Sequence, residues 1–157
     1  MQPPDDHRYA HELRAGEHYA SLSFRISSEL NQQYLFALED YGAAYLGAAD
    51  RPPVVHPVLL LHMSARTRSP SFRLAPDTGS VFAKDTVTFL RPALVGASLI
   101  VHWRIHDVYL RKGRLYQALA TEVATADGAT VLTRDAHSVF FTRGGEPLSL
   151  PRATSDG

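Results

Sequence analysis

The sequence predicts a single α+β domain in which one curved antiparallel sheet wraps around a central apolar helix. An almost wholly apolar run follows the step His56-Pro57, and from residue 79 the chain reads as successive strands to about residue 142. A helix that is apolar on all sides must be surrounded by protein, and the sheet that follows can do this. The 157 residues fit one domain, with a loose lead-in over 1–18 and a C-terminal tail over 144–157.

Composition narrows the range of partners and compartments. The 16 basic and 16 acidic residues cancel, so no overall charge would attract nucleic acid or an anionic membrane. The chain has no cysteine, which excludes disulfides, a thiolate nucleophile and cysteine metal sites, and favours a reducing compartment. Its first residues are acidic where a signal peptide would be basic. We therefore expect a cytoplasmic protein that binds neither nucleic acid nor membrane.

The N-terminal half is expected to hold one strand and two helices. Apolar and polar residues alternate over 22–26, the pattern of a half-buried strand. Ser27 or Ser28 can cap a first helix that stops at Gly42. Its apolar face is expected to consist of Leu30, Tyr34, Ala37, Leu38 and Tyr41. After an irregular segment, a second helix is expected over about 57–66, because Pro57 has a helical φ and lacks an N–H that would be unpaired there.

Four further strands are expected over about 80–90, 97–110, 114–126 and 129–142. Short glycine-containing joints at Arg111-Lys112-Gly113-Arg114 and Asp127-Gly128 are typical of hairpins, so the sheet should be an antiparallel meander.

Three histidines of these strands are candidates for metal ligands. His102 and His106 share one strand face, and His137 lies on the last strand. Residues four apart on a strand are roughly 13 Å apart and cannot share one ion. No metal site is therefore predicted.

Two motifs, in this order and spacing, resemble the MaoC-like (R)-specific enoyl-CoA hydratase and dehydratase family. Arg51-Pro52-Pro53-Val54-Val55-His56-Pro57-Val58-Leu59-Leu60 is similar to that family's apolar-His-Gly or His-Pro start of the central helix. Val87-Thr88-Phe89-Leu90-Arg91-Pro92-Ala93-Leu94-Val95-Gly96 is similar to its F-x-x-P-v-x-x-G strand and turn. The resemblance covers roughly residues 20–142. It implies a hot-dog fold and an acyl thioester substrate carried on coenzyme A or phosphopantetheine, with no cofactor.

The resemblance also indicates where catalytic residues would lie. In the family, a segment before the central helix reads Asp-x-Asn-Pro-x-His, and its aspartate and histidine orient a water and move its proton. The corresponding stretch here is Glu39-Asp40-Tyr41-Gly42-Ala43-Ala44-Tyr45-Leu46-Gly47, in which Asp40 matches the aspartate but no histidine follows. His56 is the remaining candidate acid or base, with Asp40 as its partner. The alternatives are that His56 caps the helix and that Asp40 is a solvated residue at a helix end.

Residues around this segment are candidates for substrate binding. Tyr41 and Tyr45 would line an acyl pocket or donate to a carbonyl, although such tyrosines often only pack. In hot-dog enzymes the thioester carbonyl meets backbone N–H groups at the start of the buried helix. Pro57 has none, so Val58 and Leu59 are the expected donors.

Two further candidates lie elsewhere in the sequence. His62 falls inside the apolar helix and is either a ligand-binding residue or a histidine with a partner in the core or at a dimer interface. Arg111, Lys112 and Arg114 cluster on a hairpin turn, where they would grip the phosphates of the carrier or remain solvated.

The leading functional expectation is a hydratase or dehydratase of an acyl thioester, and an alternative is a biosynthetic variant that acts on a carrier-bound intermediate or catalyses a cyclisation. A non-catalytic hot-dog partner subunit or acyl-binding protein is the rival from another class, and a hot-dog thioesterase or cyclase is a third. Because such a sheet exposes an edge, we expect at least a homodimer or a heterodimer with another hot-dog subunit.

Overall fold

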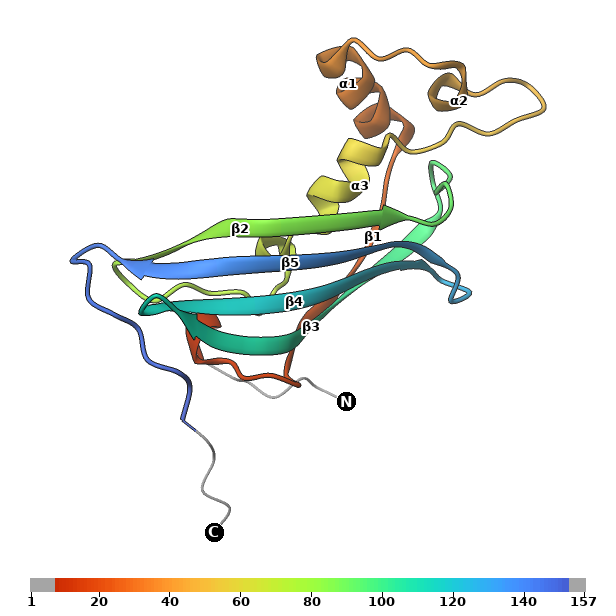
Figure 1. Cartoon of the computed structure of the whole chain (residues 1–157). Coiled ribbons are helices and arrows are strands. Elements are labelled where there is room, and N and C mark those ends of the chain that lie inside the picture. Colours follow the sequence, from red (N-terminus) through yellow and green to blue (C-terminus); the bar gives the residue numbers. More distant parts are fainter. Residues whose placement is uncertain (1–7, 153–157) are drawn as a thin grey trace.

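The computed structural model describes residues 8–152, which form one five-stranded antiparallel sheet with helices beyond one end (Figure 1). The strands are β1 (His18–Arg25), β2 (Thr78–Phe89), β3 (Ser98–Arg111), β4 (Arg114–Thr125) and β5 (Thr130–Thr142). The helices are α1 (Ser28–Leu38), α2 (Ala43–Leu46) and α3 (Pro57–Met63), with short 3-10 turns η1 (Ala10–Glu12) and η2 (Arg66–Arg68). The α+β class is confirmed, and the four later strands lie within two residues of their predicted bounds.

The strand order is β1-β3-β4-β5-β2, so only β3, β4 and β5 form a meander. Lys112 and Gly113 both have positive φ, 50° and 72°, as a two-residue type I′ hairpin requires. The loop from β2 to β3 is different, because its Val95 and Gly96 amides donate to the carbonyls of Pro53 and Ile26. These bonds direct β3 to the side of β1. The expectation of one meander that includes β2 is therefore wrong.

The core lies between α3 and the inner face of the sheet. Leu59 and Leu60 of α3 are buried, as are Trp103 and Ile105 of β3. The Trp103 Nε1–H donates to the Ser64 carbonyl just after α3, at 2.8 Å. α3 ends at Met63, earlier than expected, and its Val58 and His62 are exposed. The sheet therefore covers one side of α3 rather than surrounding it.

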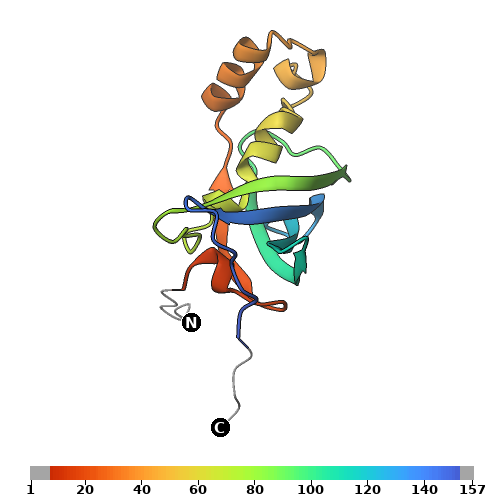
Figure 2. The same cartoon turned by 60° about the vertical axis from the view of Figure 1, so that its left-hand side comes forward.

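α1 and α2 form a lobe beyond the sheet, and α3 leads from this lobe to the sheet (Figures 1 and 2). The Ser27 hydroxyl caps α1 by accepting from the Leu30 amide at 3.1 Å. The helix ends at Leu38, because Glu39 adopts a left-handed conformation with φ 53°, and not at Gly42.

The face of α1 that is buried differs in part from the expected one. Asn31 and Leu35 are buried, while Leu38 is exposed and Tyr41 lies beyond the helix. The expectation is confirmed for Leu30 and Tyr34, which are partly buried and pack against the core, and it is wrong for Leu38 and Tyr41. The helix also packs on the segment leading into α3, which its polar residue Asn31 contacts.

The segment before β1 is packed, contrary to the expectation of a loose lead-in over 1–18. Ala10 and Leu13 are buried, and the Ala10 carbonyl accepts from Gln117 Nε2 of β4 at 2.9 Å. Residues 1–7 lie outside the described part. Of the expected tail over 144–157, residues up to 152 are described and contain no helix or strand. No helix among the described residues has the length and apolar character needed to cross a membrane.

Candidate functional site

Asp40 and His56 meet at the start of α3, where the helical lobe joins the sheet. Asp40 Oδ2 lies 3.0 Å from His56 Nε2. The two side chains differ in exposure, at 45% for Asp40 and 8% for His56. α1 ends early enough for Asp40 to turn back toward α3, and the Asp40 Oδ1 accepts from the Gly42 amide at 3.2 Å, which holds the carboxylate in place. The structure therefore brings together the two residues that the sequence paired.

His56 also caps α3, so both interpretations of this residue apply. Its Nδ1 accepts from the Val58 amide at 3.2 Å. Because Nδ1 accepts, the neutral ring carries its proton on Nε2 and donates it to Asp40. The cap therefore fixes both the tautomer and the orientation of the ring.

Asn31 fixes the backbone of His56, and sequence reasoning did not identify it. Its Oδ1 accepts from the His56 amide at 3.0 Å, and its Nδ2 donates to the Val54 carbonyl at 3.3 Å. Asn31 is buried, so these bonds satisfy polar groups that water cannot reach. The apolar pattern of α1 gives no sign that this polar side chain is buried, so the sequence offered no signal for it.

Tyr45 packs on the other side of this pair. Its ring centroid lies 4.8 Å from that of His56, with the ring planes tilted by 50°. Tyr45 stands five residues after Asp40, the spacing at which the Asp-x-Asn-Pro-x-His motif has its histidine. An aromatic ring therefore occupies that place beside His56, whereas Tyr41 is exposed on the lobe.

The expected oxyanion donors at the start of α3 are occupied. The Val58 amide donates to the His56 ring, and the Leu59 amide donates to the His56 carbonyl at 3.0 Å. Pro57 has no N–H to add. A carbonyl bound here would have to displace the His56 cap before it met the Val58 amide.

The other predicted site residues lie apart from the pair. His62 is exposed, hydrogen-bonds to Arg68, and has its ring 6.4 Å from that of Tyr34. The basic hairpin Arg111–Arg114 joins β3 to β4 at the opposite end of β3 from Ser98. β3 spans about 40 Å at the usual rise per residue, so this hairpin does not reach the Asp40 carboxylate within one chain.

The inner face of the sheet also holds a buried cation. Arg66 lies between the rings of Phe72 and Phe140, with 5.2 Å from its Cζ to each centroid, and its Nη1 is 3.4 Å from Gln117 Oε1. Burial lowers the pKa of Arg66, with nearby Tyr19 acting in the opposite direction. Burial also raises the pKa of Tyr19 to about 12, although Arg66 and Gln117 partly oppose this shift. Arg66, Tyr19 and Gln117 therefore form a buried polar group in the core, close to the end of α3.

The geometry is similar to that of solved hot-dog proteins. The (R)-hydratase from A. caviae involved in PHA biosynthesis has a TM-score of 0.62 and 22% identity, covering 82% of this chain and 98% of that one. The MaoC-like dehydratase from Rhodospirillum rubrum has a TM-score of 0.67 and 16% identity, covering 90% and 99%. A probable thioesterase from Bartonella henselae has a TM-score of 0.53 and 18% identity, covering 86% and 100%.

The sequence matches no protein-family model, and no curated protein sequence matches it. The likeness is therefore one of structure, and at these identities it establishes the fold. The expectation drawn from the two sequence motifs is confirmed at that level: the chain has the hot-dog fold, and MaoC-like dehydratases are among the structures similar to it.

Proposed function

We propose that this protein hydrates or dehydrates an acyl thioester, with Asp40 as the catalytic base and His56 as the group that orients it. The observation that carries the proposal is the 3.0 Å contact between His56 Nε2 and Asp40 Oδ2 at the start of α3. The buried His56 ring, when neutral, donates its one N–H to the Asp40 carboxylate, which is itself partly exposed to solvent. Such a carboxylate can accept a proton from water while the imidazole holds it in place.

In the hydration direction, the Asp40 carboxylate accepts one proton of a water whose oxygen forms the new bond to C3. The electron pair of the C2–C3 double bond moves toward the thioester carbonyl. The protonated Asp40 then supplies the proton that completes the C2–H bond, which regenerates the carboxylate. Dehydration follows the same steps in reverse, and one water is consumed or released in each cycle.

A second candidate is a hot-dog subunit that binds an acyl chain or a partner without catalysis. The observation that favours it is the occupied start of α3, where the Val58 and Leu59 amides are already bonded within the chain. A thioester carbonyl would lack a preformed oxyanion pocket there. The two candidates therefore differ in whether the His56 cap opens when a thioester binds.

Under either candidate function, we expect an oligomer that is located in the cytoplasm. Within residues 8–152, β2 lies at one edge of the sheet and is paired only with β5. Val81, Phe82 and Phe89 on this strand are exposed although they are large and apolar. Pairing of β2 with a second hot-dog chain would satisfy its free backbone groups and cover these side chains.

The test is to incubate the purified protein with a crotonyl thioester and a 3-hydroxyacyl thioester, each carried on coenzyme A. Loss or gain of the conjugated double bond reports hydration or dehydration, and a thiol reagent reports hydrolysis. Asp40→Asn and His56→Ala are compared with Asp50→Asn, which alters an exposed aspartate in the same lobe. The charge change of Asp50→Asn matches that of Asp40→Asn.

We expect hydration that falls at least a hundredfold in Asp40→Asn and remains unchanged in Asp50→Asn. Release of free thiol without hydration would identify a thioesterase instead. A folded protein that is inactive toward both thioesters would favour the non-catalytic subunit.

A further inference from the structure

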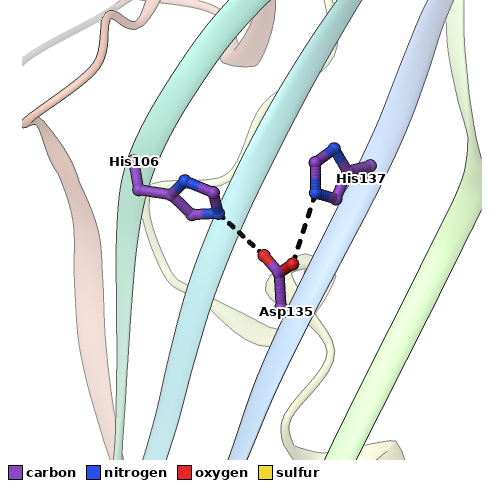
Figure 3. A group of neighbouring side chains, drawn as sticks. All are labelled: His106, Asp135 and His137. Atoms are coloured by element: carbon purple, nitrogen blue, oxygen red, sulfur yellow. Dashed lines mark hydrogen bonds and ion pairs between the residues drawn. The ribbon is translucent and has the colours of Figure 1, made fainter.

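A second polar cluster lies on the outer face of the sheet, the face opposite to α3. It consists of His106 on β3 and Asp135 and His137 on β5 (Figure 3). His106 Nε2 is 2.7 Å from Asp135 Oδ1, and His137 Nε2 is 3.3 Å from Asp135 Oδ2. Both rings thus point at one carboxylate, and neither Asp40 nor His56 takes part.

Two features of the sheet let these side chains meet across β4. First, β3 has a bulge between Ile105 and Asp107, so His106 has no partner residue in β4. A bulge changes the direction in which a side chain points. Second, the residues of β4 opposite Asp135 and His137 are Ala120 and Ala118. β3 and β5 are about 10 Å apart, and small alanines between them leave room for His106 to reach Asp135.

The donor atoms are close enough to converge on one ion. One ligand atom from each of the three residues lies within 4.8 Å of the others. Around a tetrahedral ion with bonds near 2.0–2.1 Å, ligand atoms are roughly 3.3 Å apart, so small side-chain rotations suffice. At present the two imidazole N–H groups donate to Asp135, and an ion would take the place of those two protons.

The carboxylate is prepared for a cation. Burial would raise the pKa of Asp135, but the hydrogen bond from His106 and the charges of His137 and His106 outweigh it and keep the pKa below its usual value. Each of its two oxygens faces one imidazole Nε2, which is the side from which an ion would approach. Two imidazoles and one carboxylate form a set of borderline ligands that suits zinc, cobalt or nickel better than magnesium or calcium.

Tyr109 provides support behind His137. Its hydroxyl lies 2.9 Å from His137 Nδ1, and its ring stacks on Tyr116 at 5.2 Å. The Tyr109 ring also lies edge-on to that of His137, with 5.9 Å between the centroids. With an ion on Nε2, His137 would carry its proton on Nδ1 and donate it to the Tyr109 oxygen. Metal-binding histidines commonly have such a partner.

We propose that His106, Asp135 and His137 bind one divalent transition-metal ion on the outer face of the sheet. Beside the cluster is a hollow of about 630 Å³ whose lining includes His106, Asp135, Arg104 and Glu122. Three protein ligands leave at least one coordination position for water or a ligand in this hollow. The expectation of no metal site is based on the distance between His102 and His106 along one strand, whereas this cluster joins residues of two different strands.

The experiment is calorimetric titration of the EDTA-treated, dialysed full chain with Zn²⁺, followed by Co²⁺ titration to record the visible absorption of the bound ion. The variants are His106→Ala, Asp135→Asn and Tyr109→Phe. His102→Ala is the matched control, because His102 lines the same hollow but its Nδ1 is bonded to Ser21. Circular dichroism confirms that each variant is folded.

We expect one equivalent of Zn²⁺ to bind, at least a hundredfold more weakly in His106→Ala and Asp135→Asn and about tenfold more weakly in Tyr109→Phe. His102→Ala should bind like the parent chain, and Mg²⁺ should not compete. Absence of saturable binding, or an equal loss in His102→Ala and His106→Ala, would overturn the proposal. None of these readouts depends on thioester activity, so the two proposals can fail separately.

Discussion

The Asp40–His56 pair and the His106–Asp135–His137 cluster use the same side-chain types in opposite settings. In the first, a buried imidazole serves an exposed carboxylate, and a backbone amide fixes the imidazole nitrogen that does not face Asp40. In the second, two partly exposed imidazoles converge on one carboxylate, and a tyrosine supports one of them. The first arrangement suits the movement of a proton at a fixed position. The second suits the replacement of protons by a cation.

The difference extends to what each group does for the fold. His56 is tied to α1 through Asn31 and to α3 through its cap, so the first site is part of the link between the lobe and the sheet. The second cluster joins strands that the sheet's own backbone hydrogen bonds already hold. Substitutions should therefore destabilise the protein more at the first site than at the second.

Asn31→Ala should have the largest effect on stability. It leaves the buried His56 amide and the Val54 carbonyl without partners, which we expect to cost about 3 kcal/mol of unfolding free energy. Urea denaturation followed by circular dichroism measures the loss. Gln32→Ala, an exposed change in the same helix, is the control. An equal loss of stability in the two variants would contradict the role of Asn31 in connecting α1 to the start of α3.

His56→Ala and His106→Ala compare the two sites directly. Loss of the cap in His56→Ala should cost about 1–2 kcal/mol. In the presence of EDTA, His106→Ala should cost less than about 0.5 kcal/mol, because its side chain is partly exposed and its strand is held by neighbours. Both values come from urea titrations under the same conditions. A larger loss in His106→Ala would reverse the comparison.

Tyr45→Ala tests the ring contact with His56. We expect a loss of about 1 kcal/mol, because the aromatic pair and its packing are removed together. Tyr41→Ala serves as the control, since Tyr41 is exposed on the same lobe. Thermal unfolding of the two variants side by side gives the difference, and equal midpoints would count against a structural role for the Tyr45 ring.

Acid should reveal the smallest of these effects, at the second cluster. The pKa of Asp135 in the folded chain lies below its usual value, so its stabilising contribution is complete above that usual value and is lost as pH falls through the folded-state pKa. In EDTA, Asp135→Asn should therefore lose less stability on acidification below about pH 5 than the parent chain does. Asp107→Asn is the control, and urea midpoints across the acid range provide the measurement. Parallel curves for Asp135→Asn and the parent would contradict the expectation.

The sequence predicted the four later strands well because their signals are local, whereas β1 begins at His18, four residues before its predicted start. Alternation of apolar residues and the positive φ values required at Lys112-Gly113 depend only on neighbouring positions. The same is true of the helix start at Pro57, where His56 caps as one of its two interpretations proposed. Asp40 was placed beside His56 by resemblance to a family motif, and the structure supplies the contact.

The features that were missed depend on contacts between distant segments. The burial of Ala10 relies on Gln117, which lies 107 residues away. The face of α1 was predicted only in part, because its residue Asn31 is buried against the distant segment that leads into α3. The outer cluster depends on the register of three strands and on a bulge, neither of which hydrophobic alternation records.

The bulge at His106 makes the outer cluster sensitive to chain length as well as to residue identity. Ile105 points into the core before it, and Val108 packs on the core after it, so two consecutive outward positions lie between them. Removing Asp107 would restore simple alternation, with Val108 still inward and Tyr109 still outward, but it would make His106 the regular partner of Ala118. A deletion that keeps all three ligands would therefore still change the direction in which His106 points, because the bulge sets that direction.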